Sequence, residues 1–70
     1  MALYVLENPT GSVNGSNTTF TTENNIVQIC SVIVDGITYL GEITTTDHNQ
    51  FSLGDAPNHY VYITYFGSPI

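Results

Sequence analysis

An Asp-Gly pair, Asp35-Gly36, separates two runs of β-branched residues and constrains the fold more than any other feature of the chain. The longer run covers residues 26–34 and the shorter one residues 37–40. Asp-Gly is a strong hairpin signal because both central residues of the tight antiparallel turn need a positive φ. We therefore expect two antiparallel strands here. A bulge at Gly41 would let the second strand continue over residues 42–46.

The rest of the chain alternates between short strand-forming runs and turn signals. Strand-like runs occupy residues 2–6, 18–22, 51–53 and 60–66, and no window has helical periodicity. We predict an all-β fold: a small antiparallel β-sandwich or partly open barrel of six to seven short strands. The residues expected to share its core are Phe20, Val32, Val34, Phe51, Leu53, Val61, Ile63 and Tyr65.

The last strand carries apolar residues on both of its faces. Val61, Ile63 and Tyr65 alternate onto one face, while Tyr60, Tyr62, Thr64 and Phe66 alternate onto the other. A two-layer domain should be polar on the face that looks away from its core. Either the extra aromatic residues are simply good strand formers, or this second face is buried against another chain.

The chain has no lysine or arginine, six acidic residues and two histidines. A typical domain of this length would carry about eight basic residues. Without cations the chain cannot neutralise phosphates or an anionic membrane surface, so we expect neither nucleic acid nor membrane as a partner. No ion pair can form inside the chain except with a histidine or the terminal amine.

The length of 70 residues allows only a small core, which is marginal without a staple or a partner. Cys30 is the only cysteine, so no internal disulfide can form, and we expect it to be a small buried hydrophobic residue. Homo-oligomerisation is then the expected staple. Neither a signal peptide nor a transmembrane segment is recognisable, so we expect synthesis in a cytoplasm.

A succession of short turn and strand motifs runs through most of the chain. The pattern P-x-G-x-V-N-G-x-N-x-x-F-T covers residues 9–21, and Val34-Asp35-Gly36 ends the long apolar run. Phe51-Ser52-Leu53 with Ala56-Pro57 follows, and then Val61-Tyr62-Ile63-Thr64-Tyr65. This succession resembles the small β-sandwich modules of tailed-bacteriophage structural proteins, in which the motifs come in the same order. The family usually continues after the Asp-Gly turn with Gly-x-Asp-Tyr, whereas this chain reads Gly41-Glu42-Ile43.

The resemblance implies a virion building block of the tail-fibre or head-decoration type. It covers residues 9–66, so we divide the chain into an N-terminal strand or arm, 1–8, and a single sandwich domain, 9–70. Asn8-Pro9 separates the two parts, because proline stops strand pairing. The arm is expected to add a strand to an exposed edge of a neighbouring chain.

Residues with catalytic or metal-binding chemistry are few. Asp47, His48, Asp55 and His59 flank a short strand, but their spacing matches no zinc signature and loop polarity accounts for them. No nucleophile motif is present, so we expect no enzyme, no catalytic residues, no metal and no cofactor.

We therefore predict a non-enzymatic virion structural protein, made in the host cytoplasm, that binds capsid, neck or tail proteins as a homo-oligomer. Its most concrete form is a capsid decoration or cement protein, or a head-neck or fibre-attachment component. The alternatives are a phage-encoded inhibitor of a host protein and a receptor- or carbohydrate-binding tip. The residues expected at the interface are Leu3, Tyr4, Val5, Leu6, Tyr60, Tyr62 and Phe66.

Overall fold

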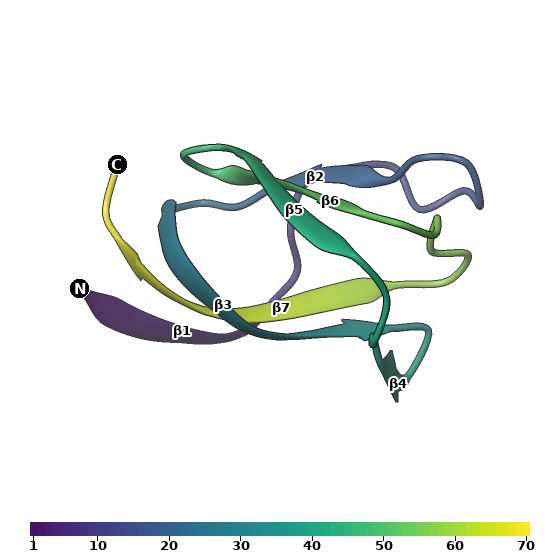
Figure 1. Ribbon diagram of the computed structural model, residues 1–70, viewed down its shortest axis with the longest axis horizontal. Coiled ribbons are helices and arrows are strands. Elements are labelled where there is room, and N and C mark those ends of the chain that lie inside the picture. The colour runs from purple at the N-terminus through teal and green to yellow at the C-terminus, as the bar shows by residue number, and fades with distance from the viewer.

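The chain folds as two stacked antiparallel sheets in a computed structural model that describes residues 1–70. The strands are β1 (Ala2–Glu7), β2 (Thr19–Thr21), β3 (Asn25–Val34), β4 (Ile37–Thr38), β5 (Ile43–Asp47), β6 (Gln50–Leu53) and β7 (Val61–Ser68). One sheet has four strands in the order β1-β7-β3-β4, and the other has three in the order β2-β6-β5 (Figure 1). The prediction of an all-β sandwich is confirmed. The fold contains no helix with the length and apolar character needed to cross a membrane.

The Asp35-Gly36 turn joins β3 to β4 as predicted, with φ values of 53° and 87° at its two central residues. The expectation that the second arm continues past Gly41 is wrong, because β4 and β5 belong to different sheets. The Tyr39 hydroxyl donates to Asp55 Oδ2 (3.2 Å) and accepts from the Asp55 N–H (3.0 Å). These bonds tie the chain after β4 to the turn after β6, so it crosses to the other layer.

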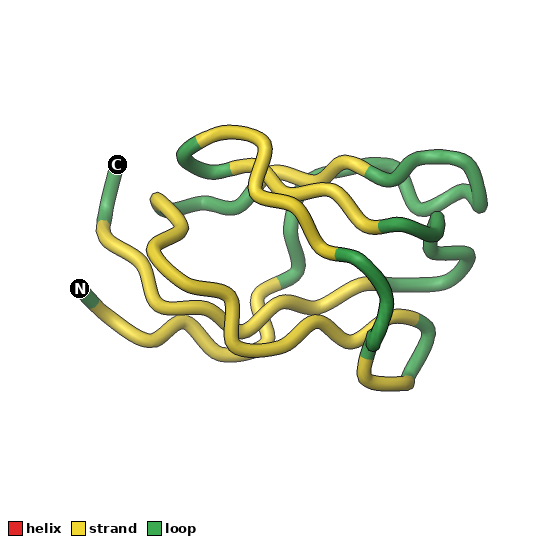
Figure 2. The backbone as a smooth tube through the Cα atoms, viewed as in Figure 1, coloured by secondary structure: helices red, strands yellow, loops and turns green.

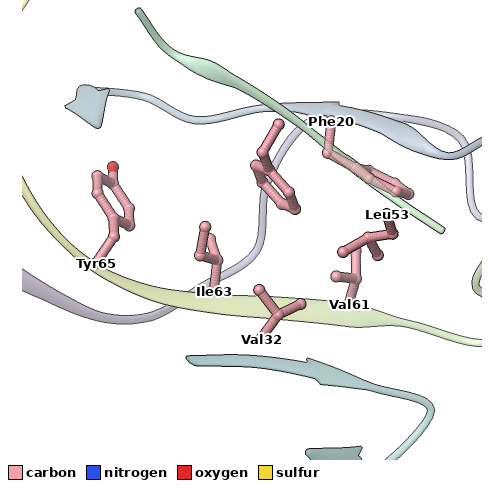
Figure 3. Close-up of a cluster of buried hydrophobic side chains, with 7 residues drawn as sticks. Phe20, Val32, Leu53, Val61, Ile63 and Tyr65 are labelled. Atoms are coloured by element: carbon pink, nitrogen blue, oxygen red, sulfur yellow. The ribbon is translucent and has the colours of Figure 1, made fainter. Parts of the chain in front are cut away.

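The core lies between the two sheets (Figure 3) and consists of Phe20, Val32, Phe51, Leu53, Val61, Ile63 and Tyr65. All seven were predicted, and Val34, the eighth predicted member, is only half-buried at its margin. Phe20 of β2 pairs directly with Phe51 of β6, and their ring centroids lie 5.9 Å apart. Full burial of each large apolar side chain stabilises the fold by roughly 1.5–3 kcal/mol.

Cys30 is exposed, so the prediction that it is buried is wrong. The pairing of β3 with β7 shifts register between Ile26 and Gln28 and again between Ile29 and Ser31. Each shift inserts a residue that has no partner in β7, which is the definition of a β-bulge. Cys30 is the unpaired residue of the second bulge and therefore leaves the regular alternation of the strand.

The two termini lie at one end of the sandwich and the long loops at the other (Figure 2). Ala2 of β1 pairs with Gly67 of β7 at the first end. At the opposite end the loop before β2 meets the loop before β7, and the Gly15 N–H donates to the Pro57 carbonyl (2.9 Å). Asn14 shapes its own loop, since its Oδ1 accepts the N–H groups of Ser16 (2.9 Å) and Asn17 (3.0 Å).

Candidate functional site

The four-stranded sheet has one face on the core and one that no other element covers (Figure 1). Along β7, Val61, Ile63 and Tyr65 are fully buried, whereas Tyr62 and Phe66 are half-buried. Directly paired residues of adjacent strands share a face. We call the uncovered side the outer face. Cross-strand pairing, together with alternation along each strand, places eight residues on it: Leu3, Val5, Gln28, Ser31, Ile33, Tyr62, Thr64 and Phe66.

The outer face carries no charge and keeps large apolar side chains in contact with solvent. None of its members is acidic, and the chain has no basic residue to place there. Leu3 is 50% exposed and Val5 is 63% exposed. Exposed apolar side chains that gather on an uncharged face are typical of interaction sites in soluble domains.

An aromatic pair continues the outer face beyond the start of β7. Tyr60 is 42% exposed, and its ring centroid lies 5.4 Å from that of Tyr62. Asp35 fixes this segment, because its carboxylate accepts the backbone N–H groups of Asn58 (3.2 Å), His59 (2.7 Å) and Tyr60 (3.2 Å). These bonds, above all the one from His59, lower the pKa of Asp35.

The predicted N-terminal arm is the edge strand of the four-stranded sheet and pairs with β7 of its own chain. Tyr4 points inward, where its ring centroid lies 5.2 Å from that of Tyr65. Leu3, Val5 and Leu6 are exposed. Whether β1 also pairs with a neighbouring chain through its free edge stays a prediction.

A polar cluster holds the end of β1 against the rest of the fold. The buried Tyr65 hydroxyl donates to Glu7 Oε1 (2.6 Å), and the Glu23 N–H donates to Glu7 Oε2 (3.0 Å). Burial, together with the hydrogen bond to Glu7, raises the pKa of Tyr65. The alternation of the sequence predicted a buried Tyr65, but nothing in it predicted Glu7 as the acceptor.

A concave surface lies between β3 and β5. Its volume is about 430 Å³, and its apolar lining includes Ile29, Cys30, Leu40 and Ile43. The sequence did not predict this groove. Apolar residues occur at both odd and even positions of residues 26–34, so the alternation of the sequence does not reveal the two bulges of the strand.

The residues considered for metal binding lie apart and are held by other contacts. Asp47 Oδ1 lies 3.0 Å from His48 Nδ1, and both side chains are exposed. Bonds from the backbone and ring of His48 lower the pKa of Asp47. Asp55 is engaged by Tyr39, and His59 donates its N–H to Asp35. No group of three or more His, Cys, Asp or Glu side chains is placed to hold a metal ion.

Comparisons with protein-family models, with curated proteins and with solved structures find no match to this chain.

Proposed function

We propose that this chain is a non-enzymatic structural protein of a tailed-phage virion that binds other virion proteins. The most concrete form is a capsid decoration or cement protein, and a head-neck or fibre-attachment component is a related form. The single observation that carries the binding role is the uncharged, mainly apolar outer face of β1, β7 and β3. The motifs of residues 9–66 follow one another in the same order as in the phage modules that they resemble, and this succession supports the virion assignment.

Binding through this face would rely on shape, apolar contact and backbone hydrogen bonds. Because the outer face has no charged side chain, attachment should change little between about 0.05 and 0.5 M salt. A sharp detachment within that range would contradict this mode of binding.

The decisive experiment counts copies of the protein in purified phage particles by quantitative mass spectrometry. Chymotrypsin is the suitable protease, since the chain has no lysine or arginine for trypsin. A decoration protein should be present in hundreds of copies at a fixed ratio to the capsid protein. Its absence from particles would overturn the proposal and favour the inhibitor of a host protein.

A pair of variants links that result to the outer face. Phe66→Ser places a polar side chain between Leu3 of β1 and Gln28 of β3 on this face, and it should reduce binding to stripped particles. Ile37→Ser is the control, because Ile37 is also apolar and is 73% exposed but lies on β4, away from β1 and β7. Equal binding by both variants would remove the outer face from the proposal.

The Tyr60–Tyr62 pair favours one second candidate, a receptor- or carbohydrate-binding tip. Exposed aromatic rings offer apolar faces on which a sugar ring can lie, and Tyr60 is 42% exposed. Such a tip would be present in few copies per particle and should bind on a glycan array. Glycan binding that survives Tyr60→Ala and Tyr62→Ala together would exclude these residues as the site.

A further inference from the structure

The free strand edges of the sandwich differ in how well they are protected against pairing with a further strand. Edge strands usually avoid adding a further strand by being short, polar or bulged. β4 has two residues, and β2 has three and is bridged on its outer side by Thr10. β5 exposes Thr44, Thr45 and Thr46 and is bulged near its end.

β1 is less protected than these three edges, because it has six residues and its exposed side chains are apolar. Ala2, Leu3 and Tyr4 pair with β7 without interruption, and the register shift comes only after Tyr4. These residues are uncharged, and no proline interrupts them. Their second set of backbone groups faces away from β7, where the sheet ends.

The absence of charge along residues 2–4 favours an uncharged, apolar strand as the partner of this edge. Glu7 is the only acidic residue of β1, and its carboxylate is turned toward Tyr65 and Glu23 of its own chain. A basic partner would therefore find no carboxylate along residues 2–4. A second copy of this chain supplies an equally uncharged strand with the same apolar side chains, and Glu7, the nearest acidic residue, lies outside residues 2–4.

We infer that β1 pairs antiparallel with β1 of a second copy about a two-fold axis at Leu3, which joins two four-stranded sheets into one continuous sheet. Leu3 then lies opposite the second copy's Leu3 on the outer face, and Ala2 lies opposite the second copy's Tyr4 on the inner face. This register centres the contact on the regular part of β1 and keeps Leu6, whose φ is 51°, outside it.

The arrangement agrees with the contacts that surround the strand. Leu3 pairs with Phe66 within its own chain, so two copies would bring two Leu3–Phe66 pairs together. The small Ala2 leaves room for the Tyr4 ring of the second copy. The two Glu7 residues lie at opposite ends of the pairing, about 25 Å apart at the rise of a strand, and do not repel each other closely. The inference deepens the proposed function, since it names the contact that would extend the outer face.

The first test measures mass in solution by sedimentation equilibrium over a range of micromolar concentrations. The wild type should be a dimer, and Leu3→Lys should raise the dissociation constant at least about tenfold, because it sets two ammonium groups opposite each other. Val27→Lys is the control, since Val27 is 59% exposed on β3 and lies away from the β1 edge. A monomeric wild type, or equal weakening by both variants, would overturn the inference.

A charge pair gives a stricter version of the same test. Leu3→Glu and Leu3→Lys should each be monomeric alone and should form a mixed dimer when combined, because opposite charges then face each other at the axis. Circular dichroism of each variant establishes that it is folded. Failure of folded variants to pair on mixing would overturn the register.

Disulfide trapping tests the register directly in a Cys30→Ser background. Leu3→Cys should cross-link readily, because directly opposed residues have Cα atoms about 4.5–5.5 Å apart, within the range of a disulfide. Val5→Cys should not, because its two copies would be about 13 Å apart along the strands. Efficient cross-linking of Val5→Cys instead would overturn the register.

These outcomes separate the inference from the proposed function. A dimer that is absent from particles keeps the inference and removes the virion role. A monomer that is abundant in particles keeps the virion role and removes the inference.

Discussion

The two faces of β7 have similar compositions and very different surroundings. Ile63 and Tyr65 on the inner face are fully buried beneath the three-stranded sheet, while Tyr62 and Phe66 on the outer face remain partly in solvent. Large apolar or aromatic side chains occur on both sides of the strand, with Thr64 and Ser68 as the polar residues of the outer side. The comparison teaches that one face of such a strand stabilises the monomer, and that the other is available for binding.

The largest expected effect comes from truncating the inner face. Ile63→Ala should lower the free energy of unfolding by about 2–5 kcal/mol, because it leaves a cavity in the core. Ile33→Ala on the outer face should cost less than about 1.5 kcal/mol, since that side chain is only half-buried. Urea denaturation measures both values. If Ile63→Ala does not fold, Ile63→Val and Ile33→Val replace the pair, and equal losses would contradict the comparison.

Removal of one hydroxyl from each face of β7 gives a subtler contrast. Tyr65→Phe should cost about 1.5–3 kcal/mol, because the hydroxyl makes a charge-assisted bond to Glu7 (2.6 Å). Tyr62→Phe should change stability by less than about 0.5 kcal/mol, as is usual for a substitution without buried polar contacts. Thermal melts at neutral pH suffice to compare them. A loss for Tyr62→Phe as large as for Tyr65→Phe would show that the outer face also supports the monomer.

Acid should weaken the hydrogen bonds by which Asp35 holds the backbone of Asn58, His59 and Tyr60. The pKa of Asp35 is lower in the folded chain than in the unfolded one, mainly through the His59 N–H. Its contribution to stability is therefore complete above the unfolded value, and it is lost as the pH falls from about 4 through the folded value. Tyrosine fluorescence and unfolding midpoints, measured from about pH 2 to about pH 6, follow the change. Asp35→Asn should reduce the pH dependence, and an unchanged profile would contradict this account of Asp35.

The smallest effect is expected at Leu6, which has a φ of 51° and is 51% exposed. A left-handed conformation costs a residue with a side chain about 1–2 kcal/mol, and glycine avoids that cost at the expense of greater freedom in the unfolded chain. Leu6→Gly should therefore change stability by less than about 1 kcal/mol, toward a more stable monomer. A loss above that value in urea denaturation would show that the Leu6 side chain packs more than its exposure indicates.

The sequence predicted the parts of the fold that have a clear local signal, such as the alternation of buried residues along β7. Alternation along residues 61–65 identified the inner residues of β7, and Asp35-Gly36 identified the turn between β3 and β4. The burial of Cys30 was predicted wrongly because apolar residues occur at both odd and even positions of its run, so the alternation does not reveal a bulge. The crossing from β4 to β5 depends on the contact of Tyr39 with Asp55, which alternation does not report.

The position of β1 illustrates the same limit for the candidate site. Alternation tells which face a residue occupies but not which strand is its neighbour. The pairing of Leu3 with Phe66 joins the two ends of the chain, and no local pattern predicts so distant a contact. The proposed interface residues were therefore identified by their apolar character, and their arrangement on one sheet came from the structure.

The pairing of Ala2 with Gly67 also makes the polypeptide almost a ring. A short peptide link between the terminal segments would close that ring with little change to the sheet. Closing a loop of this length restricts the unfolded chain and stabilises the fold by about 4 kcal/mol in the chain-entropy account of cross-links. Backbone cyclisation is thus the covalent staple open to a domain whose single cysteine cannot form one.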